Sequence, residues 1–172
     1  MGFTSLEESA VALNEPCSKE KIVLRYDRYL HVAGGSQSKG TSSIIQAWSK
    51  YKDLPHLTIV QRAGNAPNAL PPNVTLITDY LADEEMAALR DSCGVHLCPS
   101  ESEGFGHNLF QGMLASAVVV TLDFPPMNEL INNSFGVLVP PNSVKPRRLG
   151  HSCFYEVDQL ITTIQSLREL DH

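Results

Sequence analysis

Hydrophobic residues along the chain follow two alternating patterns. Six short runs are almost continuously apolar and rich in β-branched side chains, which is typical of buried strands. These runs cover residues 29–33, 57–60, 74–77, 95–98, 117–121 and 136–139. Between them, apolar residues recur at helical spacing. This second pattern predicts helices over residues 41–51, 83–89, 106–115, 128–131 and 155–170.

The alternation of strands and helices predicts the fold class. Strands that are apolar throughout belong to a parallel sheet covered on both faces, so we expect a doubly wound, Rossmann-like α/β domain over residues 30–172. Residues 1–29 are mostly polar, with one weak helical stretch at 6–13, and we interpret them as an interdomain lead-in. Asp83 is expected to cap its helix, and residues 140–153 to form a loop with a basic run. Such sheets bind ligands at the carboxyl ends of their strands.

Composition and charge exclude several classes of function. The 172 residues include 13 Lys and Arg against 19 Asp and Glu, a net charge of −6 without a dense basic stripe, so we expect no nucleic-acid partner. No apolar run reaches the roughly 18 residues of a membrane span, and the amino terminus lacks the pattern of a signal peptide. Four cysteines without a C-x-x-C pair predict reduced thiols. We therefore expect a cytoplasmic protein that holds no metal.

The first candidate for binding chemistry is the loop of residues 34–41, Gly-Gly-Ser-Gln-Ser-Lys-Gly-Thr, between a strand and a helix. Small residues let a phosphate approach the backbone, and Lys39 adds a point charge beside the positive helix end. The P-loop pattern fails because Lys39 precedes Gly40. The alternative interpretation is a glycine turn with an exposed lysine.

The second candidate is the segment of residues 99–111, PSESEGFGHNLFQ, which follows a buried strand and opens a helix. Its glycines expose backbone N–H groups at the positive helix end, where a diphosphate is favoured. Glu103 beside that end suits hydrogen bonds from neutral groups such as sugar hydroxyls, and Gln111 lies roughly 10 Å further along. The alternative is that Glu103 is an ordinary acidic residue of the first helical turn.

Three segments carry a family resemblance: HVAGGSQSKGT, VHLCPSESEGFGHNLFQGMLASAVVVT and PPMNELINNSFGVLVPP. In order and spacing they are similar to the carboxyl-terminal, nucleotide-sugar-binding domain of retaining GT-B glycosyltransferases, one half of the GT-B fold. The similarity covers roughly residues 30 to 140, and P-S-x-x-E-G-F-G opening an E-x7-E-like motif is its most specific part. Residues 2–5 also resemble the interdomain crossover of this family.

The resemblance implies roles for individual residues. Lys39 would hold the donor diphosphate, Glu103 would act as the catalytic-site glutamate on the transferred sugar, and Gln111 would meet the ribose. The amides of Phe105, Gly106 and His107 would cradle the phosphates. The full predicted donor site comprises Gly35, Ser36, Lys39, Thr78, Tyr80, Glu103, Gly104, Phe105, Gly106, His107, Asn108 and Gln111, with Thr78 and Tyr80 near the base. The donor would be a UDP- or GDP-linked sugar, used without a metal.

This chain departs from the family pattern in two places, and it covers only half of the fold. The family's arginine after the first strand is missing, since Gly35 and Ser36 stand there. Gln111 replaces a glutamate, which loses a charge-assisted hydrogen bond worth about 1–2 kcal/mol more than a neutral one. The acceptor would be bound by an amino-terminal domain, in the same longer chain or in a separate subunit. Without that domain we expect no sugar transfer.

Two other functions stay open from the sequence. A non-catalytic nucleotide-sugar sensor or partner-binding module would bind without turnover, whereas a phosphate-handling epimerase or P-loop-like hydrolase would turn over alone. Among lesser candidates, His31, His96 and Trp48 are expected to be packed residues. Glu129 matches a family glutamate, although helix-start capping explains it equally well. The basic residues Lys145, Arg147 and Arg148 are expected in a solvated loop, with a membrane or partner contact as the alternative.

Overall fold

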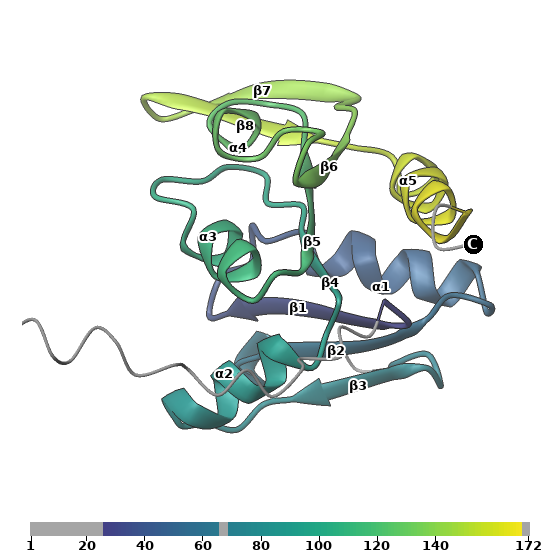
Figure 1. Cartoon of the computed structure of the whole chain (residues 1–172). Helices are drawn as coiled ribbons and strands as arrows, with labels where there is room; N and C mark the ends of the chain where they lie inside the picture. The colour runs from purple at the N-terminus through teal and green to yellow at the C-terminus, as the bar shows by residue number, and fades with distance from the viewer. Residues whose placement is uncertain (1–25, 66–68, 170–172) are drawn as a thin grey trace, which may run out of the picture.

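The computed structural model describes residues 26–65 and 69–169, which form an α/β domain (Figure 1). Its main sheet has six parallel strands in the order β3-β2-β1-β4-β5-β6. The strands are β1 (Arg28–Gly34), β2 (His56–Gln61), β3 (Val74–Ile77), β4 (Val95–Cys98), β5 (Val118–Leu122) and β6 (Gly136–Val139). Five α-helices follow them, α1 (Thr41–Lys50), α2 (Asp83–Asp91), α3 (His107–Leu114), α4 (Met127–Leu130) and α5 (Val157–Glu169), with a 3-10 turn η2 (Ala63–Asn65) after β2.

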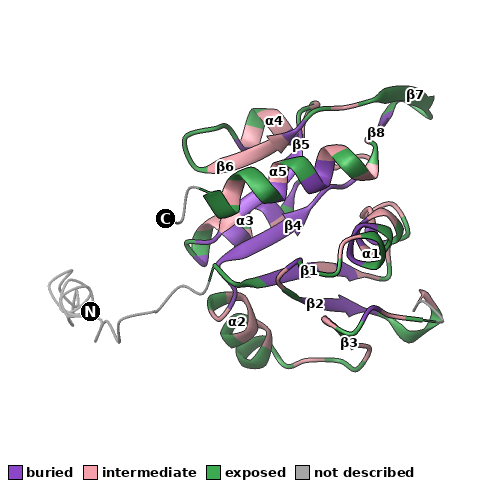
Figure 2. Ribbon diagram, turned by 90° about the vertical axis from the view of Figure 1, so that its right-hand side faces the viewer, coloured by how far each residue is buried: buried purple, intermediate pink, exposed green. Residues whose placement is uncertain are grey.

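The helices lie on both faces of the sheet because successive strand residues point in opposite directions. On one face of β1, Tyr29 packs edge-on against Trp48 of α1, with ring centroids 5.9 Å apart. On the other face, Leu30 belongs to a cluster that includes Met86 of α2. Figure 2 shows the strands as a buried layer between helices whose outer surfaces are exposed. The predicted fold class and the predicted burial of Trp48 are therefore confirmed.

All six predicted strands and the helices between them are present, with small shifts at their ends. Asp83 is the first helical residue and not the cap of its helix: the cap is Ala82, whose N–H donates to Glu85 Oε2 at 2.8 Å. The last helix begins at Val157, two residues later than predicted, because β8 extends to Phe154 and residues 155–156 connect the two elements. The predicted helix at 6–13 and the crossover at 2–5 lie outside the described residues.

The prediction of a loop over residues 140–153 is wrong. Most of this segment forms an antiparallel hairpin of β7 (Ser143–Arg147) and β8 (Gly150–Phe154). Every residue of β7 is exposed, so the strand lacks the apolar alternation by which strands are recognised in a sequence. The chain turns at Arg148 with a positive φ of 51°, without the Asn-Gly or Asp-Gly pair typical of hairpin turns. No helix among the described residues is long and apolar enough to cross a membrane.

Candidate functional site

The two candidate loops meet at the centre of the sheet. Strand β1 has β2 on one side and β4 on the other, so the connections diverge at the carboxyl ends of β1 and β4. An α/β sheet binds its ligands at such a point. The loops after these strands touch through their backbones, since the N–H of Glu101 donates to the carbonyl of Ser38 at 2.9 Å. Segments that lie far apart in the sequence thus form one surface.

The close approach of these loops explains the glycine that opens α1. Gly40 has a φ of 82°, a conformation that side chains disfavour. A Cβ at this position would lie 2.5 Å from the carbonyl oxygen of Pro99, which is a backbone atom that cannot easily move. The glycine therefore lets the first loop pass directly against the second. A glycine at this position offers no side-chain cap to α1. The first turn of α1 also contains no acidic residue.

Lys39 and Glu103, 64 positions apart, form an ion pair across this junction. The ammonium group of Lys39 donates to Glu103 Oε1, and the same oxygen accepts a hydrogen bond from Ser100 Oγ at 2.6 Å. The Glu103 side chain is only 8% exposed, against 21% for Lys39. Two donors thus hold the carboxylate in one orientation at the point where the sequence predicts contact with a sugar.

Helix α3 begins beside this ion pair in the same manner as α1. Gly106 has a φ of 76°, and the N–H groups of Leu109 and Phe110 donate to its carbonyl at 2.9 and 3.2 Å. The amides of His107 and Asn108 precede these bonds, so they point out of the helix start. The first turn has no acidic residue and no side-chain cap. The side chain of Asn108 fixes the helix to β1, because its amide donates to the carbonyl of Val32 at 2.7 Å.

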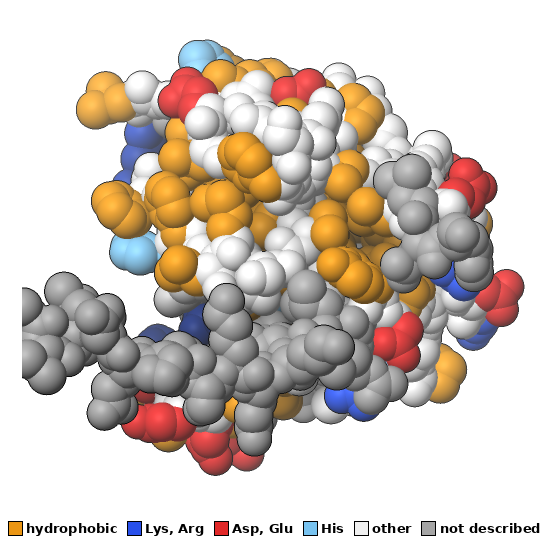
Figure 3. All heavy atoms as spheres, in the orientation of Figure 1, with side chains coloured by type: hydrophobic (Ala, Val, Ile, Leu, Met, Phe, Trp, Pro, Cys, Tyr) orange, Lys and Arg blue, Asp and Glu red, His pale blue; other side chains and the backbone are white. Residues whose placement is uncertain are grey.

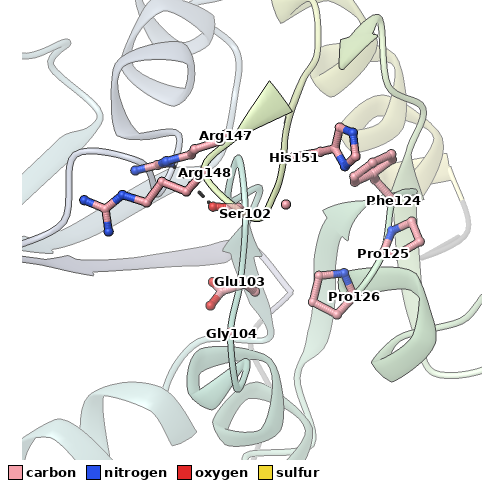
Figure 4. Close-up of a pocket in the computed structure, with 10 residues that line it drawn as sticks. Ser102, Glu103, Gly104, Phe124, Pro125, Pro126, Arg147, Arg148 and His151 are labelled. Carbon is pink, nitrogen blue, oxygen red and sulfur yellow. Dashed lines mark hydrogen bonds between the residues drawn. The ribbon is translucent and has the colours of Figure 1, made fainter. Parts of the chain in front are cut away.

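Two cavities open at this edge of the sheet, and the hairpin lines both. The larger, about 860 Å³, is lined by Ser102, Glu103, Gly104, Phe124, Pro125, Pro126, Arg147, Arg148, Gly150 and His151 (Figure 4). The smaller, about 760 Å³, is lined by Gly35, Ser36, Gln37, Ser38, Glu101, Lys145, Pro146, Arg147, Ser152 and Phe154. The basic run at 145–148 lines these cavities. All four residues are exposed, as predicted, but the predicted loop is wrong because the run belongs to the hairpin.

The structure brings some of the predicted site residues together and leaves others apart. Gly35, Ser36, Glu103 and Gly104 line the cavities, and Lys39 contacts Glu103. The predicted residues that line neither cavity are Lys39, Thr78, Tyr80, Phe105, Gly106, His107, Asn108 and Gln111. Thr78 and Tyr80 follow β3 at the outer edge of the sheet, where Tyr80 is 89% exposed. The hairpin residues and Phe124, which sequence reasoning missed, complete the cavity walls.

The buried histidines are structural, as predicted. His31 Nδ1 lies 2.8 Å from the carbonyl oxygen of Leu97, and Nε2 lies 2.9 Å from Thr41 Oγ1. Because a carbonyl only accepts, Nδ1 carries the proton and Nε2 accepts from the threonine. Burial lowers the pKa of His31 to about 4, so this imidazole is neutral at pH 7. Burial also lowers the pKa of His96, which contacts the carbonyl of Arg90 at 3.1 Å.

The cysteines and acidic residues offer no metal site in the described part of the chain. Cys93, Cys98 and Cys153 are free and buried, and burial raises the pKa of the Cys98 thiol to about 12. Cys17 lies outside the described residues. The described residues contain no group of three or more His, Cys, Asp or Glu side chains that could hold a metal ion. Glu129 is exposed in the first turn of α4, but this helix has no side-chain cap, so the interpretation of Glu129 as a capping residue is wrong.

Hydrophobic side chains gather on the face of the molecule that Figure 3 shows. Phe105 is 70% exposed and stacks on His107, with ring centroids 4.6 Å apart. Leu114 of α3 is 84% exposed, and Leu149 at the tip of the hairpin is fully exposed. Exposed apolar side chains next to a ligand cavity are typical of a surface that contacts another domain or subunit.

Comparison with known proteins assigns the sequence to a family. The model of the family "glycosyl transferases group 1" matches residues 17–146, which is more than half of the chain. A search of curated proteins finds no match to the sequence.

Solved structures share the fold at low sequence identity. The C-terminal domain of a glycosyl transferase group 1 family protein (LpcC) from Francisella tularensis is 16% identical with a TM-score of 0.58, over 85% of this chain and 77% of that one. Anabaena HepE, solved in complex with UDP-glucose, is 18% identical with a TM-score of 0.63, over 96% of this chain and 44% of that one. Sucrose-phosphate synthase from Thermosynechococcus elongatus is 19% identical with a TM-score of 0.62, over 97% of this chain and 40% of that one. The chain spans only 30% of a chain of the GtfA/B complex and 28% of TarM.

Proposed function

Because the chain belongs to the glycosyl transferases group 1 family, we propose that it is the donor-binding half of a retaining glycosyltransferase. It binds a nucleoside diphosphate sugar, UDP- or GDP-linked, at the carboxyl ends of β1 and β4. The observation that carries this proposal is the Lys39–Glu103 ion pair between two helix starts that lack acidic residues. A cation, two positive helix ends and one oriented carboxylate suit a ligand that joins a diphosphate to a polyol.

The proposed contacts follow from the chemistry of each group. Lys39 and the amides of His107 and Asn108 bind the diphosphate, whose negative charge the helix ends also stabilise. Glu103, held by Ser100, accepts hydrogen bonds from hydroxyls of the transferred sugar. Gln111 lies about one turn along α3 and meets the ribose, and the segment from Thr78 to Tyr80 lies toward the base.

The proposed reaction moves the sugar with retention and without a metal ion. The bond between the anomeric carbon and the diphosphate oxygen breaks, and its electron pair leaves with the diphosphate. The acceptor hydroxyl forms the new bond on the same face of the sugar, and its proton passes to the diphosphate. Lys39 and the helix ends stabilise the charge that develops on the leaving group.

The acceptor belongs to a partner that this chain does not supply. We propose an amino-terminal domain, in a longer chain or a separate subunit, that covers the exposed apolar side chains of Phe105 and Leu149. A solved structure of similar fold is described as a complex, GtfA/B.

Calorimetric titration with UDP, GDP, ADP and their common sugar conjugates tests the proposal. We expect one nucleoside diphosphate to bind selectively. Lys39→Met should lower the affinity for that nucleotide and for its sugar conjugate by at least tenfold, because a charge-assisted hydrogen bond is lost. Arg168→Met, on α5, is the control for loss of one positive charge. A folded chain that binds none of these ligands contradicts the proposal.

A binding module without turnover is the second candidate function. The observation in its favour is that Gly35 and Ser36 stand where the family pattern has an arginine and that Gln111 stands where it has a glutamate, so two expected charged groups are absent from the donor site. A chain that binds the conjugate yet transfers no sugar when the amino-terminal half is supplied has this second function.

A further inference from the structure

The diphosphate of a sugar nucleotide carries two negative charges, and the first loop meets it with little positive charge. Lys39 provides one cation, and its ammonium group donates to Glu103. Gly35 and Ser36 precede it without a charged side chain. If the proposed function is right, a further cation near this loop would strengthen donor binding considerably, because electrostatic attraction between unlike charges rises steeply where water is excluded.

The hairpin β7–β8 is fixed directly above this loop. The N–H of Cys153 donates to the carbonyl of Glu101 at 2.7 Å, and the N–H of Glu101 donates to the carbonyl of Ser38 at 2.9 Å. Ser152 and Cys153 are buried, with 4% and 0% exposure. The base of the hairpin is therefore packed and hydrogen-bonded to both candidate loops, so its side chains have a defined position relative to them.

Arg147 is the hairpin residue that lines both cavities. Its Nη1 lies 3.5 Å from Ser102 Oγ, 3.4 Å from Ser152 Oγ and 3.7 Å from Glu101 Oε2. Figure 4 shows Arg147 and Arg148 extending side by side from the hairpin, with a dashed line from Arg147 to Ser102. These contacts are all longer than the 2.9–3.0 Å typical of N–H···O hydrogen bonds. The guanidinium is therefore held only weakly by these three neighbours.

We propose that Arg147 binds the donor diphosphate from the side opposite the glycine loop, so that the hairpin is part of the donor site. The smaller cavity has Gly35, Ser36 and Ser38, close to Lys39 in the sequence, on its loop wall and Arg147 on its hairpin wall. Arg147 also lines the larger cavity, which contains Glu103, the ion-pair partner of Lys39. A phosphate between them replaces Glu101 as the partner of the guanidinium and accepts two parallel N–H bonds, which suits the planar fork of arginine. Lys145 adds a second cation to this cavity, against the single carboxylate of Glu101.

Two other arginines lie nearby, and their positions differ. Arg62 follows β2, and its Cδ lies 3.4 Å from the position of a Cβ on Gly35. Its side chain thus lies against Gly35 but lines neither cavity. Arg148 lines the cavity that contains Glu103 but not the one that contains the glycine loop. The geometry therefore favours Arg147 over both for contact with the diphosphate.

The experiment compares the nucleoside, its monophosphate and its diphosphate on the wild-type chain and on Arg147→Ala, by calorimetry or, for millimolar binding, by ligand-observed NMR. The base is the one that the wild-type chain prefers. We expect Arg147→Ala to weaken diphosphate binding about tenfold and nucleoside binding less than twofold. Arg147→Lys keeps the positive charge but not the planar, two-pronged donor of the guanidinium, so it should weaken diphosphate binding only a few fold. Arg168→Ala, an equal change of charge on α5, should bind as the wild type does.

The outcomes separate this inference from the proposed function. A wild-type chain that binds no nucleotide overturns both. A wild-type chain that binds the diphosphate, together with an Arg147→Ala variant of equal affinity, overturns only the role of Arg147. Equal loss of nucleoside and diphosphate binding in Arg147→Ala also overturns it, because such a loss reflects a structural role. If Arg62→Ala weakens diphosphate binding tenfold and Arg147→Ala leaves it unchanged, the contact belongs to Arg62. That result overturns the inference as well.

Discussion

Helices α2 and α3 begin in opposite ways. The first turn of α2 contains Asp83, Glu84 and Glu85, and the carboxylate of Glu85 accepts the N–H of Ala82 at 2.8 Å. Helix α3 begins at Gly106 with a left-handed backbone, and neither an acidic residue nor a side-chain cap is present in its first turn. Helix α1 begins at Gly40 in the same way as α3.

The two kinds of helix start separate the part of the chain that is arranged for binding from the part that is arranged for stability. The partial positive charge of a helix start is stabilised either by side chains of the helix itself or by an external anion. Helix α2 follows β3 at the edge of the sheet and uses its own carboxylates. Helices α1 and α3 follow the central strands β1 and β4, and neither start has a side-chain cap or an acidic residue in its first turn.

The largest expected effect comes from placing an ordinary residue at the start of α1. Gly40→Ala puts a methyl group 2.5 Å from the carbonyl oxygen of Pro99 and forces alanine into a left-handed backbone. We expect a loss of about 3 kcal/mol in the free energy of unfolding, measured with urea. The matched control is Gly104→Ala, since no atom lies within 4 Å of its Cβ position, and it should change stability by less than about 0.5 kcal/mol. Equal effects would contradict the close packing of the two loops.

A pH titration of stability tests the neutral histidine beneath the start of α1. The pKa of His31 is about 4 in the folded chain and 6.5 as its ordinary value, so the unfolded chain takes up the proton first as the pH falls. Stability is therefore complete above about pH 6.5 and declines toward pH 4 by up to about 3 kcal/mol. Urea unfolding at pH 7, 5.5 and 4 measures the decline. His31→Gln should show a shallower decline than the wild type, and equal slopes would refute the assignment.

The smallest expected effect concerns α2, whose start is capped by the side chain of Glu85. Glu85→Ala removes the acceptor of the Ala82 N–H and should lower the free energy of unfolding by about 0.5–1 kcal/mol. Glu85→Gln keeps an acceptor oxygen and should lose less. Neither change should alter nucleotide affinity, because α2 lies outside the site. Weaker nucleotide binding in Glu85→Ala would remove the distinction between the two kinds of helix start.

Most of the fold could be predicted from the sequence because buried parallel strands are apolar throughout. Runs such as Val95–Cys98 and Val118–Leu122 stand out against their surroundings for this reason. The hairpin could not be predicted, since β7 is exposed at every position and its turn lacks the usual residues. Its role in the cavities escaped sequence reasoning for the same cause.

The candidate site could be predicted only as far as its loops. Lys39 and Glu103 are each expected at the carboxyl end of a strand, and parallel strands bring those ends together. That the two side chains form an ion pair depends on the approach of the loops at Gly40, which no periodic pattern shows. The contacts of Arg147 depend in turn on the hairpin, so they too required the structure.

The most direct test of the donor site is the affinity of Glu103→Gln for the preferred nucleoside diphosphate and for its sugar conjugate, measured side by side by calorimetry. Removing the carboxylate charge releases Lys39 for the diphosphate and weakens the acceptor for sugar hydroxyls. The free nucleotide should therefore bind as tightly as to the wild type or more tightly, while the conjugate binds less tightly. If both ligands lose affinity equally, Glu103 does not distinguish sugar from diphosphate, and the account of the site is wrong.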